Sequence, residues 1–263
     1  MTAFLSRILV AAAGIPIVLG LLYLGGWWLF ALVAVAALVA LHEFYGMARP
    51  LRPLVLAGYV GVGAALVGAE IGGIDWMLAG FLATFVVAFF LFVLASTRAP
   101  ATVSISATIL GAAWIGLGLA CVLLLREFPE HGRLAAFAVL IAVWADDTAA
   151  YLVGRLIGRH KFSPALSPAK TWEGFVAGTA AAVFVTFVAL YEQDFLSIPE
   201  SLVLGAVVAI AGALGDLFES ALKRDMQVKD SGTILAGHGG VLDRVDALLF
   251  AVPAAYFTVV ALT

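Results

Sequence analysis

Charged side chains are scarce in this sequence. Of its 263 residues, 12% are Asp, Glu, Lys or Arg, whereas 64% are hydrophobic. Soluble globular domains carry about 25% charged residues. A chain with so few charges cannot cover a water-exposed surface, so most of its surface must lie in lipid. We therefore predict an all-α, polytopic integral membrane protein.

Cysteine and histidine are also rare, and the chain has no excess of positive charge. The single cysteine, Cys121, lies inside an apolar run, so it can form no intrachain disulfide and has no neighbour at metal-ligand spacing. Four histidines without paired cysteines argue against a zinc site. The formal net charge of −3 gives no support to nucleic-acid binding. No Gly-x4-Gly-Lys-Ser/Thr pattern occurs, so a P-loop nucleotide site is excluded.

Long apolar runs fill most of the chain. A spanning helix needs roughly 20 apolar residues, because each adds about 1.5 Å across a hydrocarbon core of about 30 Å. The first run is interpreted as a retained span rather than a cleaved signal peptide, because no small-x-small site precedes polar sequence. We predict nine transmembrane helices: Ser6–Leu24, Trp27–Met47, Leu54–Ala69, Trp76–Ala95, Ser104–Leu125, Leu134–Leu156, Trp172–Tyr191, Leu202–Leu222 and Val245–Leu262.

The distribution of Lys and Arg predicts the orientation. If nine spans alternate, all of the 14 basic residues except Arg126 and Arg133 fall on the side of the N-terminus. Basic loops face the cytoplasm. We therefore expect a cytoplasmic N-terminus and an outer C-terminus, in the inner or plasma membrane of a prokaryote, with the active site facing the cytoplasm.

Charge also divides the chain by function. Residues 1–133, with five predicted spans, carry almost no charge inside the membrane, and we interpret them as a scaffold facing lipid. Residues 134–263, with four spans, carry the chemistry. His42 and Glu43 begin a zinc-protease pattern, but no second histidine follows four residues after His42, so we interpret the two as a polar pair at a helix end.

Two carboxylates, Asp146 and Asp147, lie inside the sixth predicted span. Each costs about 2.5–3.5 kcal/mol at the centre of a spanning helix, so it needs a partner or a cavity. At helical spacing Asp147 and Tyr151 share one face. This face belongs either to a functional site or to a hydrogen-bonded cluster between helices.

The loop before the seventh span gathers bases and hydroxyls. Arg159, Lys161, Lys170 and Thr171 precede a helix N-terminus, whose free N–H groups attract anions. Plainer alternatives remain open, because Thr171 can cap the helix, and Arg159 and Lys161 can contact lipid headgroups.

The densest group of charges surrounds the last two spans. Asp216, Glu219, Ser220 and Lys223 stand at i, i+3, i+4 and i+7 on one helix face. Asp243 and Asp246 follow where the ninth span begins; helix capping accounts for this pair, but not for Asp216 inside an apolar run. Carboxylates and a hydroxyl are ligands that suit Mg²⁺. The bases nearby suit phosphate oxygens: Lys223, Arg224, Lys229 and Arg244.

This arrangement resembles the phosphatidate cytidylyltransferases, or CDP-diacylglycerol synthases. The matching positions are Ser220, Leu222, Lys223, Arg224, Lys229, Asp230, Gly232, Leu235, His238, Gly239, Gly240, Asp243, Arg244 and Asp246, with further blocks at 167–174 and 215–216. Two positions depart from the family pattern. Ala236 stands where the family often has Pro, and Ala149 where it often has Gly.

The resemblance implies an enzyme that converts CTP and phosphatidate into CDP-diacylglycerol and pyrophosphate with one or two Mg²⁺ ions. The implied metal ligands are Asp216, Ser220, Asp243 and Asp246, and the implied catalytic residues are Asp216, Asp243, Asp246, Lys223 and Arg224. Candidate substrate-binding residues are Lys170, Thr171, Glu173, Lys229, Asp230, His238, Gly239, Gly240, Arg244, Asp147 and Tyr151. The implied partners are membrane lipid and a second copy in a homodimer, with no nucleic acid.

Two other functions are compatible with these residues. A CTP-dependent polyprenol or lipid-alcohol kinase would also need acids, bases and a membrane cavity. An ion-coupled transporter would use Asp147 and Asp216 as cation or proton sites, although no inverted repeat is visible.

Overall fold

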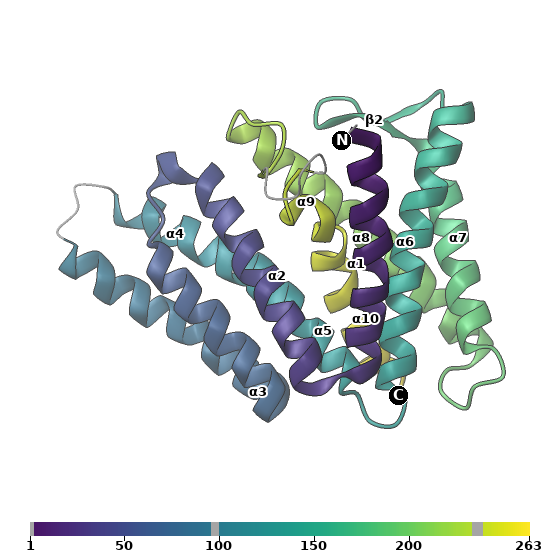
Figure 1. Ribbon diagram of the computed structural model, residues 1–263, viewed down its shortest axis with the longest axis horizontal. Coiled ribbons are helices and arrows are strands. Elements are labelled where there is room, and N and C mark those ends of the chain that lie inside the picture. The colour runs from purple at the N-terminus through teal and green to yellow at the C-terminus, as the bar shows by residue number, and fades with distance from the viewer. Residues whose placement is uncertain (1–2, 96–99, 233–238) are drawn as a thin grey trace. The chain divides into compact units, whose positions relative to one another are not determined.

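Figure 1 shows the computed structural model, which describes residues 3–95, 100–232 and 239–263. Contacts divide the chain into two compact units. The first comprises Met1–Glu127 and Met226–Val245, and the second Phe128–Asp225 and Asp246–Thr263. The predicted functional division at residue 133 stays a prediction. By contacts, the segment 226–245 belongs with the N-terminal helices.

The first unit is helical in its described part. It contains α1 (Ala3–Leu24), α2 (Gly26–Met47), the short 3-10 helix η1 (Arg49–Leu51), α3 (Val55–Leu94), α4 (Ala101–Gly111), the π-helical turn η2 (Ala112–Leu117), α5 (Gly118–Arg126) and α9 (Leu242–Val245). The ranges predicted for the first five spans all fall on these helices.

Helix α3 is a hairpin of two helical arms. It breaks at Gly73, where φ of 69° and ψ of −152° interrupt the helix. The predicted spans Leu54–Ala69 and Trp76–Ala95 correspond to the two arms. The arms approach closely because Gly68 has no side chain; a Cβ there would lie 2.2 Å from the carbonyl oxygen of Trp76. Small residues allow such backbone contact between apolar helices.

The core of the first unit lies where α2 and α3 pack against the α4–η2–α5 helix. The ring of Phe44 meets that of Trp114 edge to face at 5.9 Å. The hydroxyl of Tyr45 donates to the Thr108 carbonyl at 2.8 Å, which satisfies a buried polar group. These contacts hold the C-terminal end of α2 in one position, and that end carries Glu43.

The second unit contains α6 (Gly132–Ile157), β1 (Lys161–Ser163), β2 (Ser167–Thr171), α7 (Trp172–Leu190), α8 (Ile198–Asp225) and α10 (Leu248–Leu262). Helix α7 packs against α6 and α8, and α10 packs against α8. The two strands pair antiparallel, with Lys161 opposite Thr171. The predicted all-α class is confirmed, and the loop expected before α7 contains this short hairpin, which fixes where Lys170 lies.

Seven helices in the described part of the chain are long and apolar enough to cross a membrane, with both arms of α3 counted as one. Large apolar side chains such as Phe89, Val86 and Leu156 are exposed, as expected for surfaces in lipid. The protein is an integral membrane protein, as predicted. The number of nine crossings and their orientation stay predictions.

The contact between the two arms of α3 gives a test of this hairpin. We expect Gly68→Ala to lower stability by about 1–3 kcal/mol, because the new methyl group overlaps the backbone at Trp76. Gly63→Ala is the matched control, since nothing lies within 4 Å of its added Cβ, and it should be neutral or stabilising by up to about 1 kcal/mol. Thermal unfolding in detergent measures both. Equal effects of the two substitutions would contradict the hairpin packing.

Candidate functional site

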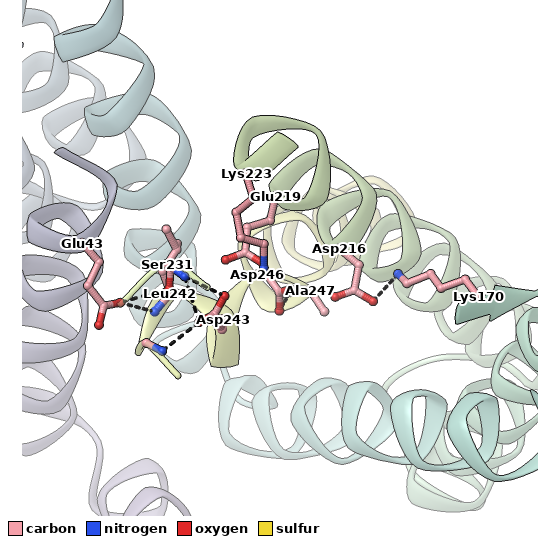
Figure 2. A network of polar contacts seen from close by, with 11 residues as sticks. Glu43, Lys170, Asp216, Glu219, Lys223, Ser231, Leu242, Asp243, Asp246 and Ala247 are labelled. Carbon is pink, nitrogen blue, oxygen red and sulfur yellow. Dashed lines mark hydrogen bonds and ion pairs between the residues drawn. The ribbon is translucent and has the colours of Figure 1, made fainter. Parts of the chain in front are cut away.

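The charged stripe predicted on the eighth span lies on α8, inside the second unit. Asp216 forms an ion pair with Lys170, which β2 carries to it from the hairpin (Figure 2). The two side chains are 27% and 28% exposed, so water screens this pair only in part. One turn further along α8, Lys223 donates to Glu219 at 2.6 Å, and Glu219 is 1% exposed.

A third carboxylate joins this group from the other end of the chain. Asp246 lies in the turn between α9 and α10 and has the carboxylates of Asp216 and Glu219 within hydrogen-bonding reach. Its Oδ1 also accepts from the Ala247 N–H at 2.9 Å. Gly215 makes this approach possible, because a Cβ there would lie 2.5 Å from the Asp246 carbonyl oxygen. The predicted span Val245–Leu262 thus begins at a two-residue turn before α10, and this turn carries an acid of the site.

Three carboxylates at such short range repel one another unless protons or cations lie among them. In the structure the ammonium groups of Lys170 and Lys223 neutralise two of them. Within the described residues, no group of three or more His, Cys, Asp or Glu side chains has the geometry of a formed metal site. The donor set is nevertheless all carboxylate oxygen, which is the chemistry that a hard divalent cation requires.

A cavity of about 580 Å³ opens beside this group, also within the second unit. Its size is that of a typical small-molecule site. Both charge types line it: Asp146, Asp147, Arg155, Lys161, Lys170 and Asp216. The structure thus brings together Lys170, Asp147 and Tyr151, which the sequence analysis predicted to bind substrate. Asp146 lines the cavity as well. From the sequence alone, the role of Asp146 could not be distinguished from that of Asp147.

Two predicted binding residues at the start of α7 have structural partners. Thr171 caps this helix, since its hydroxyl accepts from the Gly174 N–H at 3.2 Å, which confirms the plainer of its two interpretations. It also lines the cavity. Glu173 accepts from the backbone N–H of His160 at 3.2 Å and contacts its Nδ1 at 2.7 Å. It therefore fastens the hairpin to α7, and its predicted role in substrate binding stays a prediction.

The other predicted metal ligand, Asp243, belongs to the first unit. Its carboxylate accepts from the N–H of Gly240 at 2.7 Å and from that of Ser231 at 3.2 Å (Figure 2). Asp243 lies inside α9 and these donors precede it in the chain, so the bonds close the loop before α9 and are not those of the predicted helix N-cap. Its predicted role as a metal ligand stays a prediction.

The remaining predicted residues lie at the surface or outside the described part. Arg224, Lys229, Asp230 and Arg244 are exposed, and Ser220 is half-buried on α8. Gly239 has a φ of 81°, a conformation that favours glycine. His238 lies outside the described residues. The roles of all these residues stay predictions.

Glu43 was not predicted to take part in any site, yet the structure gives it several partners. It is 4% exposed and accepts from the N–H groups of Val241 and Leu242 at 3.1 and 2.8 Å. The sequence did offer one indication, which is that Glu43 lies at the end of an apolar run. A carboxylate in such a position needs hydrogen-bond donors. The donors are about 200 positions away, so the sequence could not identify them.

Comparisons with known proteins agree with the predicted family. The model of the cytidylyltransferase family matches residues 5–262. A phosphatidate cytidylyltransferase of Staphylococcus haemolyticus is 35% identical over 255 residues, covering 94% of this chain and 95% of that protein. One of Mycobacterium bovis is 34% identical over 265 residues, covering 92% and 83%. One of Bacillus subtilis is 41% identical over 149 residues, covering 56% and 55%.

The ion pair between Lys170 and Asp216 can be tested by a double-mutant cycle. We expect Lys170→Met to destabilise the protein by about 1–2 kcal/mol, because it leaves the Asp216 carboxylate facing other acids. Asp216→Asn should suppress that loss, giving a coupling energy of at least about 0.5 kcal/mol. Denaturant unfolding in detergent measures the four proteins. Lys161→Met, at the same cavity but exposed, serves as the control. Additive effects of the two substitutions would refute the pairing.

Proposed function

Because the chain belongs to the cytidylyltransferase family, we propose that it transfers CMP from CTP to phosphatidate, forming CDP-diacylglycerol and pyrophosphate. Relatives that match over nearly the whole chain carry the name of this activity. The observation that supports it most directly is the cavity lined by Asp216, the acid that Asp246 approaches from the turn before α10. An anionic nucleotide and an anionic lipid headgroup both need the bases that line this cavity.

This reaction needs no strong general base. The phosphate of phosphatidate is already ionised near neutral pH, so it can attack the α-phosphorus of CTP without losing a proton to the enzyme. The main obstacle is repulsion between two anions, which cationic side chains reduce while they align the reactants. We assign this role to Lys170 and Arg155 at the cavity. The sequence pattern adds Lys223, Arg224, Lys229 and Arg244.

The carboxylates have a complementary role. Asp216 and Asp246 are the proposed ligands of Mg²⁺, and the sequence pattern adds Ser220 and Asp243. When bound, Mg²⁺ would neutralise charge on the triphosphate and on the departing pyrophosphate. The protein's own contribution is to hold the acids together at the glycine contact between α8 and the turn before α10. Lys170, now paired with Asp216, is then available to contact a phosphate oxygen.

The membrane determines how the two substrates arrive. The diacyl chains of phosphatidate stay in the hydrocarbon, whereas CTP must enter from water. We propose that the cavity faces the cytoplasm, which agrees with the excess of Lys and Arg on that side of the predicted spans. A homodimer is proposed on the resemblance alone.

The defining experiment incubates detergent-purified protein with labelled CTP, phosphatidate and Mg²⁺, and identifies the products. We expect CDP-diacylglycerol and pyrophosphate, and complete loss of both when a chelator removes the metal ion. Formation of CDP together with a lipid monophosphate from a lipid alcohol would point to a kinase instead. Ion flux through reconstituted vesicles without CTP would point to a transporter.

The substitution Asp246→Asn tests whether the negative charge of Asp246 is needed for turnover, because it removes that charge without altering side-chain size. We expect turnover to fall by at least about 100-fold, since a proposed metal ligand is lost. The variant should stay folded, because the exchange also removes repulsion from Asp216 and Glu219. Asp194→Asn, in an exposed loop of the same unit, should behave like wild type. Unchanged turnover in the Asp246 variant would remove this residue from the site.

A further inference from the structure

A buried carboxylate in the first unit accepts hydrogen bonds from a loop that carries the family's sequence pattern. Glu43, on α2, accepts from the N–H groups of Val241 and Leu242, and the Ser231 hydroxyl lies 3.5 Å from its Oε2 (Figure 2). These partners lie 188 to 199 positions further along the chain. Glu43 thus connects the N-terminal helices to the segment that contains Asp243.

A second carboxylate fastens the same loop from within. Asp243 accepts from the N–H groups of Ser231 and Gly240. Each end of the segment is therefore bonded to carboxylates: the Ser231 end by its N–H and hydroxyl, and the 240–242 end by three successive N–H groups. The bonds to Asp243 alone would only close the loop on itself. The bonds to Glu43 also fix the position of the loop relative to α2.

The loop is shaped to receive this side chain. A Cβ on Gly232 would lie 2.5 Å from Glu43 Oε1, and one on Gly240 would lie 2.5 Å from Oε2. Gly240 is buried and Ser231 is 7% exposed. The two glycines and Ser231 thus form a closely fitting recess around the Glu43 carboxylate. A carboxylate that only accepted hydrogen bonds from the free N–H groups at the start of α9 would not require a recess of this kind.

We infer that Glu43 is a positioning residue for the transfer reaction, because it holds the loop that places Asp243 and Arg244. This inference rests on the proposed function. Glu43 does not touch substrate; it acts through backbone N–H groups. Residues that orient an active-site group from behind typically change activity by about 10- to 100-fold when they are lost, because small displacements of catalytic groups are costly.

The test combines turnover with backbone hydrogen exchange of the purified full chain. In Glu43→Gln we expect the amides of Val241 and Leu242 to exchange about tenfold faster, because the amide group offers one acceptor where the carboxylate offered two. Exchange in α3 should not change. We expect kcat/KM for CTP and phosphatidate to fall by about 10- to 100-fold, measured well below the melting temperature of each variant.

Two further variants make the outcome decisive. Gly232→Ala crowds the same carboxylate from the loop side and should reproduce both changes, which covers the case that the Glu43 variant does not fold. His42→Gln is the matched control, because His42 is the residue next to Glu43 but its side chain is exposed and its Nδ1 lies 3.1 Å from the Tyr59 hydroxyl, away from the loop. It should leave exchange at 241–242 and turnover unchanged.

Each result decides a different point. Unchanged amide exchange in both variants would overturn the contact. Faster exchange with wild-type turnover would overturn the positioning role while leaving the proposed function standing. If the wild-type protein made no CDP-diacylglycerol, the proposed function would fail, and the role in the reaction with it, whereas exchange would still report on the loop.

Discussion

Repulsion among carboxylates that water screens only in part is the constraint on which the rest of this structure depends. Asp246, in the turn before α10, has the carboxylates of Asp216 and Glu219 on α8 within hydrogen-bonding reach, and both follow the long apolar stretch of that helix. Such a group is stable only where cations are supplied. The hairpin brings Lys170 to Asp216, and the next turn of α8 brings Lys223 to Glu219. The short β-hairpin thus has an electrostatic role, since it brings a base to the acids of α8.

Small residues are the second requirement, because acids on different elements meet only where backbones can approach. Gly215 allows the turn at Asp246 to lie against α8, and Gly68 allows the arms of α3 to pack together. In lipid there is little hydrophobic force to drive helices together, so close van der Waals contact and hydrogen bonds take its place. The same principle operates in the loop around Glu43, where Gly232 and Gly240 leave room for a carboxylate.

The first unit contains a buried carboxylate that the distribution of charge alone did not single out. The N-terminal helices looked inert, because they carry almost no charge inside their apolar runs. Yet α2 supplies Glu43 to the loop that ends in Asp243, and that loop belongs by contacts to the same unit. This contribution links the first half of the chain to the family pattern in the second.

The sequence by itself determined the class of protein, the position of every long helix and the family. Apolar runs of spanning length predict helices because backbone groups in lipid must be bonded within one segment, and the motif from Ser220 to Asp246 is long enough to be specific. Only the tertiary structure decided which acids meet, that Lys170 pairs with Asp216, that Asp246 lies in a turn before α10, and that Glu43 accepts from the N–H groups of Val241 and Leu242. The reason is that helical periodicity relates residues up to about two turns apart. Contacts between residues tens or hundreds of positions apart depend on how the helices pack.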